Sequence, residues 1–270
     1  MSTPTCDCVP LPRIFGYDDS QPTIPYGDLR TSIADREYYN DQTITDFQLP
    51  VCRTIGDEAF RGSSLTGISA PMCVSIGDSA FVGCQQLKDG LYDFSSVKSI
   101  GTDAFRGIWP TSQTEMFISI PNVEIIGSSA FYNSRFGADY GTTQNLDLPK
   151  CTKIGEYAFG AEHSSQSKHY KKILLPSIEE IGTGAFYRLS AELEEVHLGP
   201  NCRVLGNYVF YDTYSDSWAL YVEAISPPQL GGLGEDVGDV TIYVPAASVD
   251  AYKSASGWST HASYINPIPI

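Results

Sequence analysis

The side chains best suited to chemistry in this chain of 270 residues are four histidines, seven cysteines and several adjacent glutamates. His163 and His169 fall in one loop but lie six residues apart, which is not a spacing that zinc ligands use. Glu179/Glu180 and Glu194/Glu195 invite comparison with a glycosidase, whose general acid and base must face each other across a cleft. Whether any of these groups can act together depends on the elements that position them.

Sequence motifs for established active sites are missing. There is no His-Glu-x-x-His, no Gly-x-Ser-x-Gly and no phosphate-binding loop. The glycines at Gly231–Gly234 lack the strand and helix of a dinucleotide site, and Asp212–Asp216 does not match a calcium loop. We therefore predict no catalytic residue, no metal site and no cofactor.

A repeated hexapeptide, Ile-Gly-x-x-Ala-Phe, is the dominant pattern. Successive copies begin 21, 24, 26, 28, 27 and 24 residues apart, which is typical of a repeat array. The seven copies, the last one degenerate, are Ile55–Phe60, Ile76–Phe81, Ile100–Phe105, Ile126–Phe131, Ile154–Phe159, Ile181–Phe186 and Leu205–Phe210.

A second element lies between the hexapeptides and alternates apolar with polar residues, as in Leu65/Ile68/Ala70 before Pro71. Alternation over so few residues predicts a short strand with one buried face, and the proline ends it. The hexapeptide glycine suits a positive φ or a close backbone approach, and the next residues suit a single helical turn. Each phenylalanine then enters the core, where burial contributes roughly 1.5–3 kcal/mol, and stacked repeats form a ladder.

Together the hexapeptides, Gly83-Cys84 and the strands ending in proline resemble the BspA-type leucine-rich repeat family of bacterial surface proteins, over about residues 44–245. The resemblance implies an α/β repeat solenoid: a right-handed leucine-rich-repeat-type β-solenoid with short parallel strands on one face and few helical residues. The family is associated with attachment to host proteins and other cells, although a fold does not fix a function.

Three regions are predicted. Residues 1–43 form an N-terminal cap or arm, with a possible short helix near Asp28–Tyr39, or else an anchor to a larger assembly. Residues 44–225 form the array of about seven coils. Residues 226–270 form a small C-terminal cap with one strand, a short helix through Tyr252 that Gly257 stops, and Trp258 as a plug.

Most cysteines have a structural explanation. Cys52, Cys73, Cys151 and Cys202 each lie three residues before a hexapeptide, so they point the same way as small buried side chains. Cys84 is expected to be buried too, and a disulfide framework is not predicted. The remaining pair, Cys6 and Cys8, belongs either to a tail without further role or to a metal or intermolecular thiol site.

Net charge limits the partners. The formal net charge of −15, with 32 acidic and 17 basic residues, argues against nucleic acid and against anionic membrane surfaces as partners.

No apolar run reaches the length of a transmembrane helix. The first twelve residues do not read as a signal peptide, which leaves an intracellular protein, another export route or a removed signal open. Composition favours an exported bacterial protein, so we expect a cell-surface or secreted location.

Candidate binding residues come from loops that lengthen the later coils, at residues 132–143, 160–170 and 211–218. Equivalent insertions in a stack project from the same edge, and Tyr, Trp and Arg are enriched in interface hot spots. Aromatic rings among polar residues also suit stacking on a glycan. The alternative is a set of tolerated surface loops. The candidate residues are Arg135, Phe136, Tyr140, His163, His169, Tyr170, Tyr211, Tyr214 and Trp218.

Two functions remain open at this point. The first is a non-catalytic binding or adhesion module that recognises a protein or glycan on a host or neighbouring cell. The second is a structural repeat component of a phage tail or a cell-wall assembly. Catalysis ranks third because a solenoid face supplies no obvious cleft for paired carboxylates. Acidic or histidine side chains converging in a pocket would revive it.

Overall fold

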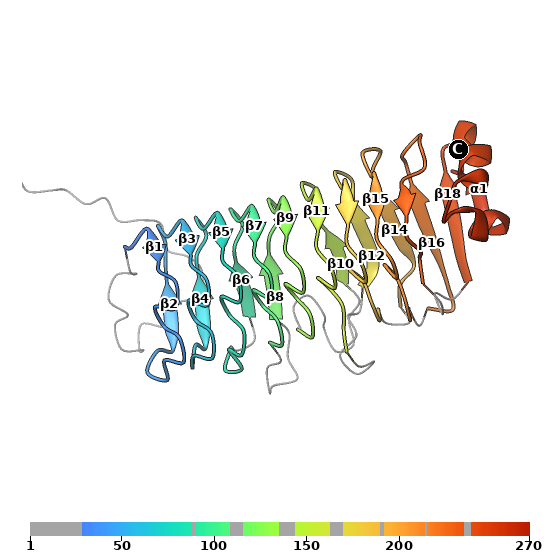
Figure 1. Cartoon of the computed structure of the whole chain (residues 1–270). Helices are drawn as coiled ribbons and strands as arrows, with labels where there is room; N and C mark the ends of the chain where they lie inside the picture. Colours follow the sequence, from blue (N-terminus) through green and yellow to red (C-terminus); the bar gives the residue numbers. More distant parts are fainter. Residues whose placement is uncertain are drawn as a thin grey trace, which may run out of the picture.

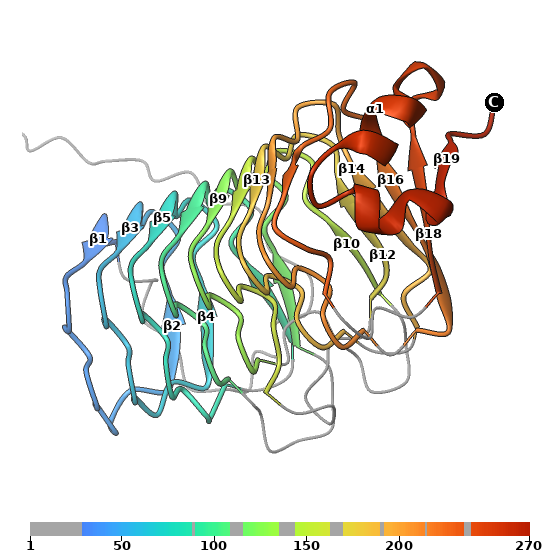
Figure 2. The same ribbon diagram turned by 45° about the vertical axis from the view of Figure 1, so that its right-hand side comes forward.

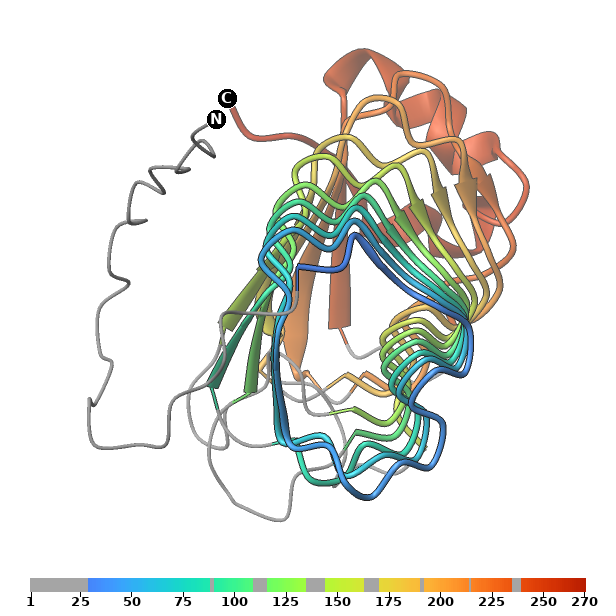
Figure 3. The same cartoon turned by 90° about the vertical axis from the view of Figure 1, so that its left-hand side faces the viewer.

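The protein is an elongated solenoid whose coils stack along one axis (Figure 1). Its computed structural model describes residues 29–87, 90–108, 116–134, 144–162, 170–189, 192–213, 215–234 and 239–270. Viewed along the axis, successive coils follow nearly the same path (Figure 3). A parallel-strand solenoid with few helical residues was predicted, and the structure confirms it.

One face carries nine two-residue strands, each ending at the first residue of a hexapeptide or its equivalent. Neighbouring strands are parallel and pair these residues in register, as Ile55 does with Ile76. The strands are β1 (Ser32–Ile33), β3 (Thr54–Ile55), β5 (Ser75–Ile76), β7 (Ser99–Ile100), β9 (Ile125–Ile126), β11 (Lys153–Ile154), β13 (Glu180–Ile181), β15 (Val204–Leu205) and β17 (Gln229–Leu230).

A second face carries the longer strands predicted from the apolar alternation. Strand β14 shows the pattern clearly, because Val196 and Leu198 are buried while Glu195 and His197 point outward. Parallel strands therefore occupy two faces, not the single face that the family resemblance implied. These strands pair as β2 (Asp46–Gln48) with β4 (Gly67–Ser69), β6 (Gly90–Asp93) with β8 (Met116–Ser119), and in one sheet β10 (Gln144–Asp147), β12 (Tyr170–Leu175), β14 (Glu195–Leu198), β16 (Ser217–Val222), β18 (Asp239–Val244) and β19 (Ile265–Pro267).

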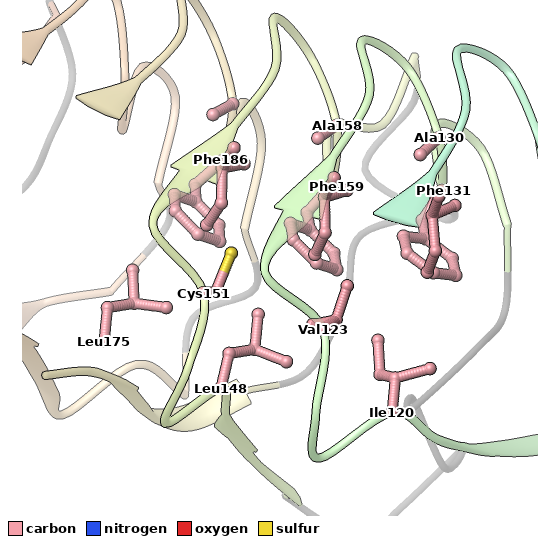
Figure 4. Close-up of a cluster of buried hydrophobic side chains, with 14 of the residues drawn as sticks. Ile120, Val123, Ala130, Phe131, Leu148, Cys151, Ala158, Phe159, Leu175 and Phe186 are labelled. Carbon is pink, nitrogen blue, oxygen red and sulfur yellow. The ribbon is translucent and has the colours of Figure 1, made fainter. Parts of the chain in front are cut away.

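The core is a ladder of the hexapeptide phenylalanines. From Phe60 to Phe210 the seven rings are at most 3% exposed. Consecutive ring centroids lie 4.9–5.6 Å apart, with interplanar angles of 2–9°. Figure 4 shows three of these rings, Phe131, Phe159 and Phe186, among other buried side chains such as Ile120, Leu148 and Leu175. The predicted ladder is thus confirmed.

The hexapeptide glycine is required by a close approach between coils. A Cβ on Gly127 would lie 2.5 Å from the carbonyl carbon of Gly101 in the preceding coil, and the other hexapeptide glycines are as crowded. The positive φ falls two residues later, as at Ser79 with φ 55°. The predicted helical turn is replaced by a turn that bonds to the next coil, since the Phe81 N–H donates to Ala104 O at 2.8 Å.

The array begins earlier than predicted. β1 already pairs with β3, and the Tyr38 ring stacks on Phe60 at 5.2 Å in the place of a ladder phenylalanine. The segment around Asp35 is a turn like those of the later coils, so the helix predicted near residues 28–39 is wrong over its described part. Ala34 stands at the glycine position, and the described residues contain no earlier coil that would crowd its side chain. Cys6 and Cys8 lie outside the described residues.

A C-terminal segment covers the last coil as predicted (Figure 2), but it begins later than residue 226, because β17 and β18 still extend the two sheets of the array. It contains the 3-10 helix η2 (Ala246–Ser248), helix α1 (Val249–Ser254), the 3-10 helix η3 (Ser259–Tyr264) and β19. Tyr252 and Trp258 are fully buried; the phenol donates to Ala224 O at 2.7 Å and the indole to Pro228 O at 2.8 Å. None of the helices in the described segments is long and apolar enough to cross a bilayer.

The five cysteines in the described segments are free and buried, as expected. Four of them share a stack position that other coils fill with Val97, Val123 or Ile178. Burial raises the pKa of Cys73, Cys151 and Cys202 to about 12. These thiols therefore stay protonated and inert in the folded protein.

The coil-to-coil approach yields a first prediction. Gly127→Ala should lower the free energy of unfolding by about 3 kcal/mol, because its methyl group collides with backbone that cannot move independently. Gly232→Ala is the matched control, since a Cβ there would meet no atom within 4 Å and the φ of Gly232 is not positive. The control should change stability by about 0.5 kcal/mol or less. Equal denaturant midpoints for the two variants would contradict the close approach.

The cysteine row yields a second prediction, on alkaline stability. The pKa of these thiols is raised on folding, so the unfolded chain loses protons first and stability falls as pH rises from about 9 towards 12. At about pH 10.5 the loss is about 2 kcal/mol per thiol. Replacing Cys73, Cys151 and Cys202 by Val, the residue that other coils use, should flatten this decline in urea unfolding measured between neutral and alkaline pH. An unchanged decline would show that the thiols are not protected.

Candidate binding surface

The structure separates the predicted binding residues into three groups. Tyr211 lies on the edge of the array and is half-buried. Tyr170 and Trp218 are each only 3% exposed, with their rings against Phe159 and Phe210, so the prediction that they contact a ligand is wrong. Their strands begin earlier than the loop pattern suggested, and strand alternation turns both rings inward. Arg135, Phe136, Tyr140, His163, His169 and Tyr214 lie outside the described residues.

A row of tyrosines runs along the edge formed by the hexapeptide turns of four successive coils. We call it the tyrosine edge. Its successive ring centroids are 6.3, 6.0, 5.2 and 5.7 Å apart; three of the pairs are edge-to-face and one is stacked. The row consists of Tyr132, Tyr157, Tyr187, Tyr211 and Tyr208.

Two of these rings are well exposed. Tyr157 is 37% exposed and Tyr208 is 51% exposed, and both occupy the fourth hexapeptide position, where φ is positive. Sequence reasoning overlooked them because they fall inside hexapeptides, at positions where the motif allows any residue. The signal was a tyrosine at the same repeat position in two copies of the hexapeptide, with Gly184 in the copy between them.

Glycines in the following coils make room for the rings. A Cβ on Gly184 would lie 2.4 Å from Cε1 of Tyr157, and a Cβ on Gly160 would lie 3.2 Å from Cδ2 of Tyr132. Each of these two tyrosine rings therefore lies over the coil that follows it. This packing fixes the ring orientations before any ligand arrives.

Two arginines accompany the tyrosines. The Arg106 guanidinium lies 5.4 Å from the Tyr132 ring centroid, and that of Arg188 lies 5.2 Å from the Tyr187 ring centroid. Arg188 also donates from Nε to Asp212 at 2.8 Å and from a terminal nitrogen to the backbone oxygen of Glu162. These contacts restrain the cations and the rings beside them.

A second aromatic row, the sheet stripe, lies on the outer face of the six-stranded sheet. His197, Tyr221 and Tyr243 stack face to face, with ring centroids 4.3 and 4.9 Å apart. Lys172 donates to Glu195 at 2.9 Å and His197 contacts the same carboxylate oxygen at 3.0 Å. The hydrogen bond from Lys172 is the main reason that the pKa of Glu195 is lowered. The stripe is typical of cross-strand stabilisation because its rings cover each other's faces.

The glutamate pairs do not form a catalytic arrangement. Glu194 is ion-paired with Lys171 at 2.7 Å and Glu179 with Arg203 at 2.6 Å, both at the surface. Over the described ranges, no three His, Cys, Asp or Glu side chains are grouped to hold a metal ion. One shallow hollow on the surface contains no acid or histidine; it is lined by Pro200, Asn201, Cys202, Arg203, Ala224, Ile225, Ser226, Pro227 and Pro228.

Comparison with known proteins shows the family to which the repeat array belongs. Six copies of the profile described as "BspA type Leucine rich repeat region" match residues 31–138 and 95–216, which is more than half of the chain. The chain belongs to the BspA-type leucine-rich repeat family. The match starts at the coil of β1, in agreement with the structure and not with the predicted start at residue 44. The BspA-type fold is a repeat scaffold without catalytic machinery of its own.

Three solved structures are similar over most of their length. A leucine-rich repeat protein from Bacteroides ovatus is 14% identical, with 88% of this chain and 76% of that chain covered and a TM-score of 0.37. The pneumococcal vaccine antigen PcpA is 17% identical, with 89% and 77% covered and a TM-score of 0.32. A leucine rich cell surface protein from Faecalibacterium prausnitzii is 17% identical, with 88% and 82% covered and a TM-score of 0.34. Among curated proteins, none matched the sequence.

The exposure of the tyrosine edge yields a third prediction. Brief nitration of the folded protein should modify Tyr157 and Tyr208, while Tyr170 and Tyr252, which are at most 3% exposed, stay unmodified until the protein is unfolded. Peptide mass spectrometry gives the order of modification. Early nitration of Tyr170 would restore that residue as a surface candidate and contradict its place in the core.

Proposed function

We propose that this BspA-type protein is a non-catalytic binding module of the bacterial cell surface, or a secreted one, and that the tyrosine edge is its contact surface. The ligand is a protein or a glycan of a host or neighbouring cell. The exposure of Tyr157 and Tyr208 on a preformed row is the observation that carries the proposal. The attachment role implied by the family resemblance supports the surface location.

Stability alone does not account for the tyrosine edge. The earlier coils hold the same edge together with ion pairs, for example Arg36 and Arg61 on either side of Glu58 at 2.8 Å each. The later coils replace these charges with large rings that remain partly in water. An exposed apolar cluster rimmed by polar groups is typical of an interaction site, and tyrosine and arginine are among the commonest hot-spot residues.

The net negative charge of the protein limits which classes of ligand it can bind. The chain has a formal net charge of −15, so a polyanion such as nucleic acid would be repelled at long range. A neutral or basic ligand meets no such barrier. The rigid turns add to affinity because little conformational freedom is lost when the tyrosines engage.

Binding to host cells and matrix components gives the fourth prediction. The full chain should bind at least one target in a panel of host cells, matrix proteins and glycans. A Tyr157→Ala/Tyr208→Ala variant should bind that target at least about tenfold more weakly, since hot-spot rings typically contribute more than 1 kcal/mol each. Surface plasmon resonance on the captured target gives the affinities.

The matched control is Tyr264→Ala, which removes a ring of similar exposure, 49%, from the C-terminal cap. It should bind like the unaltered protein. Equal losses for the control and the double variant would show that the tyrosine edge is not the contact surface. Absence of binding to every target, together with assembly of the purified chain into larger particles in electron microscopy, would favour a structural component of a phage tail or cell wall and overturn the proposal.

A further inference from the structure

We propose that the tyrosine edge binds an extended, neutral, β-linked polysaccharide that lies along the solenoid axis, with sugar rings stacked on Tyr157 and Tyr208. This inference rests on the proposed function and names the chemical class of its ligand. It follows from the spacing of the two rings, from their orientation, from the charge around them and from the narrowness of the row.

The spacing of the coils matches the repeat of an extended sugar chain. The coils of a parallel solenoid repeat every ~4.8 Å, the distance between neighbouring strands, so the Cα atoms of Tyr157 and Tyr208, two coils apart, are offset by about 10 Å along the axis. An extended chain of β-1,4-linked pyranoses advances by close to one coil spacing per sugar. Its alternate rings would therefore meet Tyr157 and Tyr208 in turn, and Gly184 in the coil between them adds no side chain that would displace the Tyr157 ring.

The two exposed tyrosines contact their neighbours in the row edge to face. Tyr157 makes edge-to-face contacts with both Tyr132 and Tyr187, at interplanar angles of 85° and 66°, and Tyr208 is perpendicular to Tyr211 at 88°. An edge-to-face pair covers a face of only one of its two rings, and Tyr157 and Tyr208 remain 37% and 51% exposed. A sugar can pack its C–H groups against the ring surface that is left. The sheet stripe is the internal comparison, because Tyr221 and Tyr243 stack on each other and their shared faces are closed.

Local charge favours a neutral ligand. Arg188, beside the row, is held by Asp212 at 2.8 Å and by the backbone of Glu162, so its charge is already balanced. Arg106 is paired with Asp103 at 3.2 Å. An acidic polysaccharide would meet compensated cations on a strongly acidic protein and lose affinity accordingly.

The tyrosine edge is narrow, which favours a glycan over a protein as its ligand. A stable protein interface typically engages about 20–30 residues on each side. The tyrosine edge is only two side chains wide, formed by the fourth hexapeptide position and the residue that follows the hexapeptide. Such a ridge matches a single polysaccharide chain better than a protein surface of ordinary size.

The fifth prediction uses defined neutral glycans. Affinity electrophoresis of the full chain should show retardation by soluble β-1,4-linked polysaccharides such as glucomannan, xyloglucan and hydroxyethyl cellulose, and none by the α-linked dextran. With β-1,4-linked oligosaccharides of two to six sugars in calorimetry, affinity should rise steeply once three sugars are present, because the first and third rings then reach both tyrosines. The dissociation constant should increase about tenfold for Tyr157→Ala and for Tyr208→Ala.

Two further variants sharpen the test. Gly184→Ala keeps every tyrosine but displaces the Tyr157 ring, so it should weaken binding about as much as Tyr157→Ala while circular dichroism confirms folding. Tyr243→Ala, in the sheet stripe, should bind normally. Failure of every β-linked glycan to bind, or binding that is unaffected by loss of Tyr157 and Tyr208, would overturn the inference.

The glycan inference can fail while the proposed function stands, and treatment of the target cells separates the two outcomes. If the chain binds cells through the tyrosine edge, and that binding survives periodate oxidation of the cell surface but is lost after protease treatment, the ligand is a protein. The glycan inference is then overturned while the proposed function stands. Sensitivity to periodate and resistance to protease support the inference.

Discussion

The close approach of successive backbones at the hexapeptide glycine is the constraint on which the rest of the structure depends. A Cβ at Gly127, Gly155 or Gly206 would lie 2.4–2.5 Å from backbone atoms of the coil before it. Only glycine lets the coils close to the spacing at which each turn bonds to the next. That same spacing brings the phenylalanines into a ladder with centroids 4.9–5.6 Å apart. The single methyl of the hexapeptide alanine, fully buried in all six exact copies, completes this arrangement.

Because the core is specified by so few positions, the remaining positions of each coil are free to vary. On the turn edge this freedom gives two different surfaces. The first coils place ion pairs there, centred on Glu58, and the later coils place tyrosines. One repeat rule thus builds a regular core along the whole array and a distinct surface on part of it. The tyrosine edge inherits its regular ring spacing from the core, so its geometry needs no dedicated loop.

The sequence predicts what repeats and little of what departs from the repeat. The apolar alternation indicates the longer strands, and the hexapeptide indicates the phenylalanine ladder and the row of buried thiols. The cap could also be predicted, since Tyr252 keeps helical spacing, but α1 ends at Ser254, before the Gly257 that was expected to stop it. The coil of β1 could not be predicted, because Ala34 and Tyr38 replace the diagnostic glycine and phenylalanine. Only a coil at the end of the stack tolerates this replacement.

The candidate site was harder to predict for a related reason. Aromatic residues in the long insertions drew attention to Tyr170 and Trp218, whereas strand pairing extends β12 and β16 far enough to bury both. The rings that are exposed sit inside the motif, at positions where the repeat sets no residue type. Their exposure depends on the positive φ and on the neighbouring Gly184, and neither is visible without the coil-to-coil register.

The most direct test of this account changes the register without changing any tyrosine. A second copy of residues 77–100, one complete coil, is inserted after Leu205, so that three coils instead of two separate Tyr157 from Tyr208 while Gly184 stays beside the Tyr157 ring. The control carries the same copy after Ile100, before the tyrosine edge. Repeat arrays tolerate such insertions, and both proteins should fold. We predict that binding to the ligand of the unaltered protein is lost in the first and kept in the second. Equal binding by both would contradict the claim that coil spacing sets the site.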